Sequence, residues 1–330
     1  MTVLRTVRVA AVQATPVVLD AAATVDKAVG LIADAAARGA ELVVFPECFV
    51  ALYPTWVWAG AAVSDPAALD EIYIRLWESS VEVSGPLVNR LAEACSTHGV
   101  HCVIGVNERE PGRSSSVFNT MLTLGPQGLL ARHRKLMPTR HERLFHAFGR
   151  GEDLTVVDTS VGRVGGLICW ENRMPLARYA VYRGGPQIYV APTADSSDGW
   201  QALVRAIAIE SGAFVISAIQ YVPASAYPAD FPVKLPKGTD TVSPGGTCIV
   251  AAGDSGYLAE PLYGEEGILV AECDLRAALT HKSWFDVTGH YSREDVLVPL
   301  LSTGSPLLSP SPRVEMSQDG NRSIGVPAED

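Results

Sequence analysis

Residues 25–47, VDKAVGLIADAAARGAELVVFPE, contain the pattern on which the fold depends. Apolar side chains recur at helical spacing through the first part of this stretch, and Gly39 follows as a stop signal. A short apolar run, 42–45, then ends at Pro46, as expected of a strand that is buried on both faces. The stretch therefore predicts an amphipathic helix followed by a buried β-strand. The residues on the apolar face of the helix are Val25, Val29, Ile32, Ala33 and Ala36.

The same unit recurs along the chain. Helical patterns at 87–95, 176–182 and 200–210 are each followed by glycine and then by a strand, at 102–106, 188–191 and 214–219. A first strand is predicted at 7–14. Hairpins are predicted where two strands flank a turn, for 120–124 with 129–133, 154–158 with 165–169, and 247–251 with 268–273. Helix–strand units mixed with hairpins predict an α/β fold with a mixed sheet whose faces are covered by helices.

The composition excludes several classes of protein. The chain has 330 residues, a net charge of −10 and 48% hydrophobic residues, with a mean hydropathy of +0.17. So many apolar residues exclude a disordered protein, and the negative charge argues against a nucleic-acid partner. No run reaches the roughly 18 to 20 apolar residues of a membrane helix, and the N-terminus lacks a signal-peptide pattern. We therefore expect a cytoplasmic protein with no membrane partner.

One domain is expected over residues 1–300, followed by a tail over residues 301–330. No break in composition divides the first part, and its length suits one large domain. The tail is rich in Ser, Pro and Gly and has no apolar periodicity. It predicts a mobile segment or a contact between subunits, with a docked C-terminal arm as the alternative.

The cysteines indicate neither a disulfide framework nor a metal site. Six are spread along the chain, at positions 48, 95, 102, 169, 248 and 273. There is no CxxC motif and no Cys/His pair at zinc-ligand spacing. We predict reduced, mostly buried thiols.

Three reactive side chains lie at the C-terminal ends of predicted strands, where α/β sheets usually form their sites. Glu47 follows the strand at 42–45, Lys135 follows 129–133, and Cys169 ends 165–169. Taken singly, each has an ordinary alternative: a capping or surface carboxylate, a solvated basic loop, and a packed thiol. Together they supply a base, a cation and a soft nucleophile, which suits addition to an electrophilic carbon bound to nitrogen. Glu142, the one acid among the bases that surround it, is expected to be ion-paired and ionised.

These four residues lie in the segments FPE (45–47), HRKLMPT (133–139), HER (141–143) and CWEN (169–172). With these motifs the sequence resembles the nitrilase superfamily of carbon–nitrogen hydrolases across most of its length, and CWEN is similar to the true nitrilase branch. The resemblance implies a four-layer αββα sandwich with mixed sheets. It also implies hydrolysis of an organic nitrile to the carboxylic acid and ammonia, without metal or cofactor.

The resemblance assigns a role to each residue. Cys169 is the expected nucleophile, which forms a thioimidate and then an acyl-thioester, and Glu47 is the expected general base. Lys135 is expected to stabilise charge, and Glu142 to orient Lys135 or the attacking water. One segment departs from the family pattern: Phe145–Gly151 reads FHAFGRG, where members often have Trp-Gly followed by Gly-Asp-Gly.

Aromatic residues near these motifs suggest an apolar pocket for aromatic or arylaliphatic nitriles. They are Tyr53, Trp56, Trp58, Trp170 and Trp200. The alternative is that they fill the core or an interface. Ala194 is small and follows a strand, so it leaves room for a bulkier substrate. The predicted substrate contacts are Tyr53, Trp170, Thr193 and Ala194.

Three other functions remain open. An amidase, or a nitrile or cyanide hydratase that stops at the amide, would use the same residues. A Cys/His hydrolase would need a histidine, of which His290 in GHYSRED is the most suggestive. A non-catalytic subunit would keep the sandwich only for assembly. The resemblance also implies a homo-oligomer that is built from dimers and extends to a larger spiral in some nitrilases, with a small-molecule nitrile as the substrate.

Overall fold

The computed structural model describes residues 4–55, 65–112, 114–254 and 256–302. The chain divides into two compact units, Met1–Tyr291 and Ser292–Asp330. The described part of the second unit contains one helix, α8 (Glu294–Ser302). The predicted tail lies outside the described residues from position 303 onward, so its separation from a domain ending at 300 stays a prediction.

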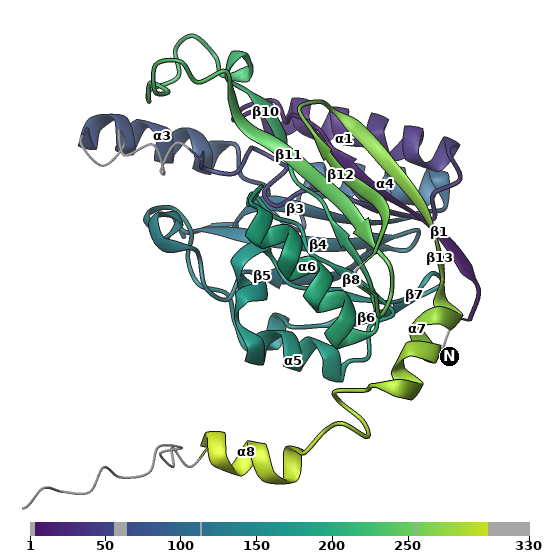
Figure 1. The fold of residues 1–330 in the computed structure, drawn as a ribbon. Helices are drawn as coiled ribbons and strands as arrows, with labels where there is room; N and C mark the ends of the chain where they lie inside the picture. The colour runs from purple at the N-terminus through teal and green to yellow at the C-terminus, as the bar shows by residue number, and fades with distance from the viewer. Residues whose placement is uncertain (1–3, 56–64, 113, 255, 303–330) are drawn as a thin grey trace, which may run out of the picture. The chain divides into compact units, whose positions relative to one another are not determined.

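The first unit contains two mixed β-sheets (Figure 1). The strands of the first sheet, in spatial order, are β13 (Gly267–Asp274), β1 (Thr6–Gln13), β2 (Leu42–Val44), β3 (His101–Arg109), β4 (Val117–Gly125) and β5 (Gly128–Arg134). The second sheet has β10 (Tyr221–Pro223), β11 (Thr241–Val250), β9 (Phe214–Ser217), β8 (Ile188–Val190), β7 (Gly162–Gly166) and β6 (Val156–Thr159), and β12 (Tyr257–Tyr263) pairs with β11. The pairs β1–β2–β3 and β7–β8–β9 are parallel, as the helix–strand units predict.

Strand β1 explains why the sheets form layers. Its side chains alternate between two cores, because successive residues of a strand point to opposite faces. Val7 and Val9 belong to the core between the sheets, whereas Ala10 and Val12 pack toward the helices on the outer face. Each central strand is thus covered on both faces and reads as a continuous apolar run.

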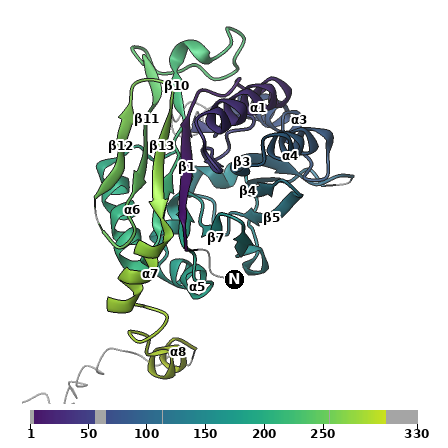
Figure 2. The ribbon, with the colours of Figure 1, turned by 90° about the vertical axis from the view of Figure 1, so that its right-hand side faces the viewer.

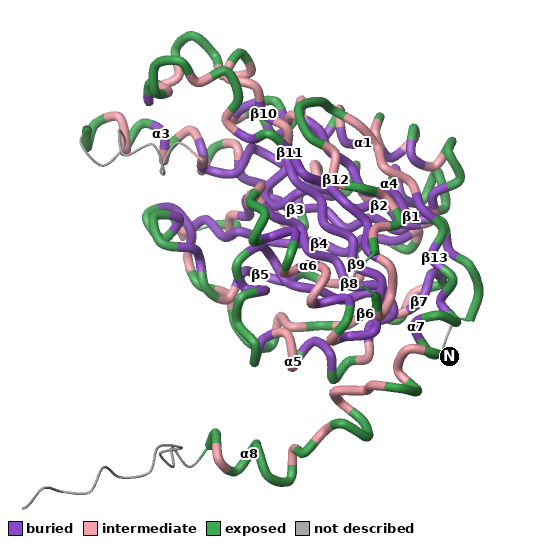
Figure 3. The backbone as a smooth tube through the Cα atoms, in the orientation of Figure 1, coloured by how far each residue is buried: buried purple, intermediate pink, exposed green. Residues whose placement is uncertain are grey.

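Helices cover the outer face of each sheet (Figure 2). Helices α1 (Ala21–Ala37) and α4 (Pro86–His98) share a core with the first sheet. Helices α5 (Pro175–Arg183) and α6 (Asp198–Ser211) share one with the second. The buried residues accordingly concentrate in the strands at the centre of the unit (Figure 3). The predicted four-layer αββα sandwich is confirmed.

One predicted hairpin is wrong. The strands expected at 247–251 and 268–273 do not pair with each other, because β11 pairs with β12 and β13 pairs antiparallel with β1. The intervening strand β12 was not predicted, since its residues alternate between half-buried and exposed. After β12 the chain turns at Gly264, which has a φ of 80°, and enters the other sheet.

Two further α-helices lie in the described residues of the first unit. Helix α3 (Pro66–Glu78), which was not predicted, buries Ile72 and Leu76 in a small separate core with Phe145. Helix α7 (Leu275–Trp284) follows β13 directly. None of the helices in the described residues is both long and apolar enough to cross a membrane.

Candidate active site

Lys135 lies at the centre of a buried ion-pair cluster. It directly follows β5, and its backbone N–H donates to the carbonyl oxygen of Asn119 on β4 at 2.8 Å. Its ammonium Nζ lies 2.7 Å from Glu47 Oε1 and 2.7 Å from Glu142 Oε2, and all three side chains are 0% exposed. The alternatives of a solvated basic loop for Lys135 and a surface acid for Glu47 are therefore wrong.

The backbone that carries Glu47 is held from two directions. Gly105 of β3 packs so closely that a Cβ on it would lie 2.7 Å from the Glu47 Cα. From the second sheet's side, Gln220 Nε2 donates to the carbonyl oxygens of Glu47 at 2.9 Å and Cys48 at 3.1 Å. Gln220, which is buried and follows β9, thus links the Glu47 loop to the other sheet.

Glu142 is surrounded by hydrogen-bond donors. It lies in a 3₁₀ turn, Arg140–Leu144, and both of its carboxylate oxygens are occupied. Its five partners are Lys135 Nζ, Asn119 Nδ2, Tyr53 OH, His146 Nδ1 and the Thr139 backbone N–H, at 2.7 to 3.2 Å. A carboxylate with this many donors is strongly stabilised in its ionised form.

Glu47 has a different environment. Its Oε1 accepts from Lys135 Nζ and from Asn119 Nδ2, both at 2.7 Å. Its Oε2 is buried and has no hydrogen-bond partner among the described residues. A buried carboxylate oxygen without a donor is costly in a protein interior, and it is free to receive a proton.

The electrostatics separate the two carboxylates further. Burial raises the pKa of Glu47; Lys135 offsets this in part, and the charge of Glu142 adds to the rise. Burial also favours a higher pKa for Glu142, but Lys135 and His146 outweigh it and hold that pKa well below its usual range. The two carboxylates likewise hold the pKa of Lys135 far above normal despite burial. Glu142 is thus a fixed counter-ion, whereas Glu47 has the greater proton affinity.

Cys169 lies at a sharp turn just beyond β7. Its φ of 52° is in the left-handed region, which costs an ordinary residue roughly 1–2 kcal/mol. The Cys169 N–H donates to the Pro192 carbonyl oxygen at 2.8 Å, and Asn172 Nδ2 donates to the Cys169 carbonyl oxygen at 2.9 Å. These bonds hold the thiol at the start of the 3₁₀ turn Cys169–Arg173.

Glu171 joins the cysteine turn to the segment that carries Lys135. Its Oε2 accepts from the Ile168 N–H at 2.8 Å, next to Cys169. The same carboxylate accepts from the Leu136 N–H at 2.5 Å, and its Oε2 contacts His133 Nε2 at 2.9 Å. One buried carboxylate thus fixes the Cys169 turn, which belongs to the second sheet, against the end of β5 in the first.

The environment of the thiol keeps it protonated. Burial raises the pKa of Cys169, and the nearby charge of Glu47 raises it further. Lys135 and a hydrogen bond from Thr193 Oγ1, 3.0 Å from Sγ, act in the opposite direction without cancelling the rise. A neutral thiol needs a base to become a nucleophile, and Glu47 is the carboxylate with an unoccupied oxygen.

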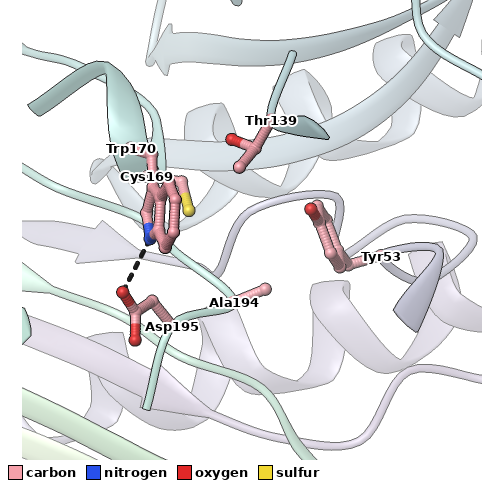
Figure 4. A pocket seen from close by; sticks show the side chains of 6 residues that line it. All are labelled: Tyr53, Thr139, Cys169, Trp170, Ala194 and Asp195. Atoms are coloured by element: carbon pink, nitrogen blue, oxygen red, sulfur yellow. Dashed lines mark hydrogen bonds between the residues drawn. The ribbon is translucent and has the colours of Figure 1, made fainter. Parts of the chain in front are cut away.

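A pocket of about 230 Å³ opens onto Cys169 (Figure 4). Its lining residues are Tyr53, Thr139, Cys169, Trp170, Ala194 and Asp195. Three of the four predicted substrate contacts therefore line it, whereas Thr193 instead contacts the Cys169 sulfur. Trp170 Nε1 donates to Asp195 Oδ2 at 2.7 Å, which fixes the indole at the rim.

Other sequence candidates lie elsewhere. Trp200 is fully buried in the core beneath α6 and donates to Ser217 Oγ, so it is a packing residue. Trp56 and Trp58 lie outside the described residues. His290 is exposed and contacts the Trp284 carbonyl oxygen and the ring of Tyr291, which gives the Cys/His hydrolase no support.

Several residues of the site were not predicted. Asn119 bridges the two glutamates, His146 contacts Glu142, and Gln220 and Glu171 fix the two loops. Asn119 lies within a strand that is buried throughout, so no local pattern marks it. Within the described parts of the chain, no group of three or more His, Cys, Asp or Glu side chains is arranged to hold a metal ion.

The αββα sandwich carries a buried Glu–Lys–Cys site, and comparison with known proteins gives the class of the chain as a carbon–nitrogen hydrolase. The chain belongs to the carbon–nitrogen hydrolase family, which it matches over residues 8–280. It is 42% identical over 300 residues to a bifunctional nitrilase/nitrile hydratase of Nicotiana tabacum, covering 88% of this chain and 85% of the relative. It is also 42% identical over 301 residues to Nitrilase 3 of Arabidopsis thaliana, covering 88% and 85%. The predicted membership of the nitrilase superfamily is confirmed.

Solved structures show the same fold at lower sequence identity. A carbon–nitrogen hydrolase from Helicobacter pylori matches with a TM-score of 0.71 at 19% identity, covering 90% of this chain and 99% of that one. A branch 10 member of the nitrilase superfamily from Saccharomyces cerevisiae matches with a TM-score of 0.68 at 21% identity, covering 88% and 97%.

Proposed function

We propose that the chain is a nitrilase that hydrolyses an organic nitrile to the carboxylic acid and ammonia, with Cys169 as nucleophile and Glu47 as general base. The relatives named nitrilase support this enzyme class over most of the chain. We infer the roles of Glu47 and Glu142 from the difference in the number of hydrogen-bond partners of their carboxylates. Glu47 Oε2 has no partner among the described residues, whereas five groups contact the carboxylate of Glu142.

The first half of the reaction forms a covalent intermediate. Glu47 accepts the Cys169 proton, and the thiolate sulfur bonds to the nitrile carbon as one C–N π bond breaks. The nitrogen takes up this proton from Glu47, which gives a thioimidate and leaves Glu47 ionised. The Lys135 ammonium stabilises the negative charge that develops on the nitrogen in this step and in the tetrahedral species that forms when water adds later. The Trp170 backbone N–H is a further candidate donor.

The second half consumes two waters. Glu47 removes a proton from the first water as its oxygen adds to the thioimidate carbon, and the C–N bond then breaks to release ammonia. The second water cleaves the acyl-thioester, which releases the acid and returns the proton to the Cys169 sulfur. Glu142 keeps Lys135 in position through its 2.7 Å ion pair throughout the cycle.

We propose aromatic or arylaliphatic nitriles as the substrates. The pocket volume of about 230 Å³ suits a small ring, and Tyr53 and Trp170 contribute aromatic side chains to its lining. Thr193 is proposed to hold the thiol, and Ala194 to leave room for the substituent. Comparing kcat/KM for phenylacetonitrile, benzonitrile and a short dinitrile tests this preference, and a preference for the dinitrile would overturn it.

The second candidate is release of the amide. Two relatives from Nicotiana tabacum carry the name bifunctional nitrilase/nitrile hydratase. An amide forms if the first tetrahedral species expels the Cys169 sulfur instead of ammonia. Product analysis separates the two outcomes, since the proposed reaction yields acid and ammonia in equal amounts.

The decisive experiment is ammonia release from a nitrile panel by wild type and Cys169→Ala. We expect the variant to be folded and inactive, and substantial turnover by it would overturn the nucleophile assignment. Cys273→Ala is the matched control, because Cys273 is also buried but lies on β13 and does not line the pocket. Glu47→Gln is expected to cost roughly 10²- to 10³-fold in kcat.

We further propose a cytoplasmic homo-oligomer that is built from dimers, with residues 1–300 as the hydrolase domain and 301–330 as a subunit contact. Light scattering on the full chain and on a version that ends at residue 302 tests this contact. An unchanged molecular mass after truncation would remove the proposed role of the tail.

A further inference from the structure

The segment that departs from the family pattern, Phe145–Gly151, brings a histidine into the ion-pair cluster. The side chain of His146 is 0% exposed, and its Nδ1 lies 3.0 Å from Glu142 Oε1. Its backbone N–H donates to the Glu142 carbonyl oxygen at 2.9 Å, and the next N–H, of Ala147, donates to the Val117 carbonyl oxygen of β4 at 2.8 Å. The ring is therefore fixed against the carboxylate by its own backbone.

The other ring nitrogen faces a second acceptor. His146 Nε2 lies 2.8 Å from Asn107 Oδ1. The orientation of the Asn107 amide is set independently, because its Nδ2 donates to the carbonyl oxygens of Val50 at 3.1 Å and Leu52 at 3.0 Å. Rotating this amide would place its oxygen against two carbonyl oxygens and lose both bonds. Asn107 therefore presents an acceptor to the ring.

A neutral imidazole has one N–H, whereas His146 lies between two acceptors. With either neutral tautomer, one buried lone pair would face another at hydrogen-bond distance, which a protein interior penalises. The imidazolium donates from both nitrogens and satisfies both contacts. We propose that His146 is a permanent imidazolium, a second buried cation that positions the catalytic cluster through Glu142.

This assignment balances the charges of the cluster. Glu47 and Glu142 contribute two negative charges, and Lys135 and His146 contribute two positive ones, all on buried side chains. With Glu142 neutralised from one side by His146, the Lys135 ammonium remains available to Glu47 and to the charge that develops on the substrate. The titratable groups around the ring are Glu142 in direct contact, Lys135 and Tyr53 through Glu142, and Glu47 beyond Lys135.

A second buried histidine, His133, provides a comparison for the proposed imidazolium of His146. His133 is also buried, and its Nε2 contacts Glu171 Oε2 at 2.9 Å. Its Nδ1, however, has no partner among the described residues. One N–H, on Nε2, satisfies the contact with Glu171, and no described acceptor faces Nδ1, whereas both ring nitrogens of His146 face acceptors.

Nitrogen-15 NMR of the histidine-labelled full-length protein tests the proposal directly. We expect one ring with both nitrogens protonated at pH 8, where unperturbed histidines are neutral. This signal should disappear in His146→Asn, which keeps a neutral N–H donor near Glu142. A single protonated nitrogen on His146 at pH 8 would overturn the proposal. The NMR result reports the protonation of His146 and does not depend on catalysis, so it can be positive or negative whether or not the nitrilase reaction is correct. The positioning role, in contrast, rests on the proposed nitrilase reaction.

Kinetics test the positioning role. In His146→Asn we expect kcat to fall roughly 10- to 100-fold with KM changed less than about threefold, the effect of losing one charge-assisted bond to a carboxylate. The acid limb of the pH profile should move to higher pH, because the cluster has lost a cation that favours ionised carboxylates. His101→Asn is the control, since His101 is buried on β3 with no bond to the cluster. An unchanged kcat and pH profile in His146→Asn would refute the role.

Discussion

Replacing Lys135 by methionine removes the cation that two buried carboxylates share. All three side chains are 0% exposed, and the ammonium lies 2.7 Å from each carboxylate. Breaking a buried ion pair by removing one partner costs about 3–5 kcal/mol, because the remaining charge is left uncompensated. With a urea m-value of roughly 3 kcal/mol/M, the unfolding midpoint should fall by about 1 to 1.7 M. We also expect kcat to fall roughly 10²- to 10³-fold.

The loss of stability in Lys135→Met should depend on pH. Burial already raises the pKa of Glu47 in the wild type, and without the ammonium this pKa rises further. A carboxyl group whose pKa is higher in the folded state binds a proton more tightly there, so stability decreases as the pH rises above the ordinary Glu value of about 4.3. The variant should therefore be closer to wild type at pH 5 than at pH 8.

Urea unfolding followed by circular dichroism at these two pH values measures the effect. Adding Glu142→Gln to Lys135→Met should recover part of the stability but not the activity, because one uncompensated charge is removed. Lys237→Met is the control, since Lys237 is exposed. A variant as stable as wild type at pH 8 would refute the reasoning that the three groups form a charged, buried cluster.

Two further predictions concern the glycines and the thiol. Gly105→Ala should lower kcat at least tenfold, because the added Cβ would lie 2.7 Å from the Glu47 Cα. Gly30→Ala, at a position in helix α1 with open space around it, should instead stabilise the fold by about 0.5–1 kcal/mol. Steady-state kinetics and thermal unfolding measure both variants, and a Gly105→Ala variant as active as Gly30→Ala would contradict the role of Gly105. Thr193→Val removes a hydrogen bond that lowers the pKa of Cys169, so the pH dependence of alkylation by iodoacetamide should shift to higher pH, and an unshifted profile would contradict that contact.

The strand ends were predictable because the sequence changes character there. An apolar run that stops at a charged or reactive residue marks Glu47 and Cys169 directly, and the motifs assign their roles. No apolar run that ends at a reactive residue identifies Asn119 or His146. Asn119 is one polar residue within a wholly buried strand, and its importance depends on two glutamates that are distant in sequence.

The incorrect prediction of a hairpin between 247–251 and 268–273 has a similar physical cause. Strand β12 alternates between half-buried and exposed positions and contains Pro261, so its sequence does not resemble a core strand. Local turn signals also do not say whether the next strand stays in one sheet or enters the other. That choice depends on which apolar faces meet, which is a property of the assembled layers rather than of the turn.

The proposed nucleophile and the proposed base belong to different sheets. Cys169 follows β7 of the second sheet, while Glu47 and Lys135 follow strands of the first, and only the packed core and a few bonds such as those of Glu171 and Gln220 connect them. A slight sliding of one sheet over the other would separate the reacting groups while every strand remained intact. Heat should therefore inactivate the enzyme at a lower temperature than it melts the secondary structure, and large-to-small substitutions in the core between the sheets should widen this interval.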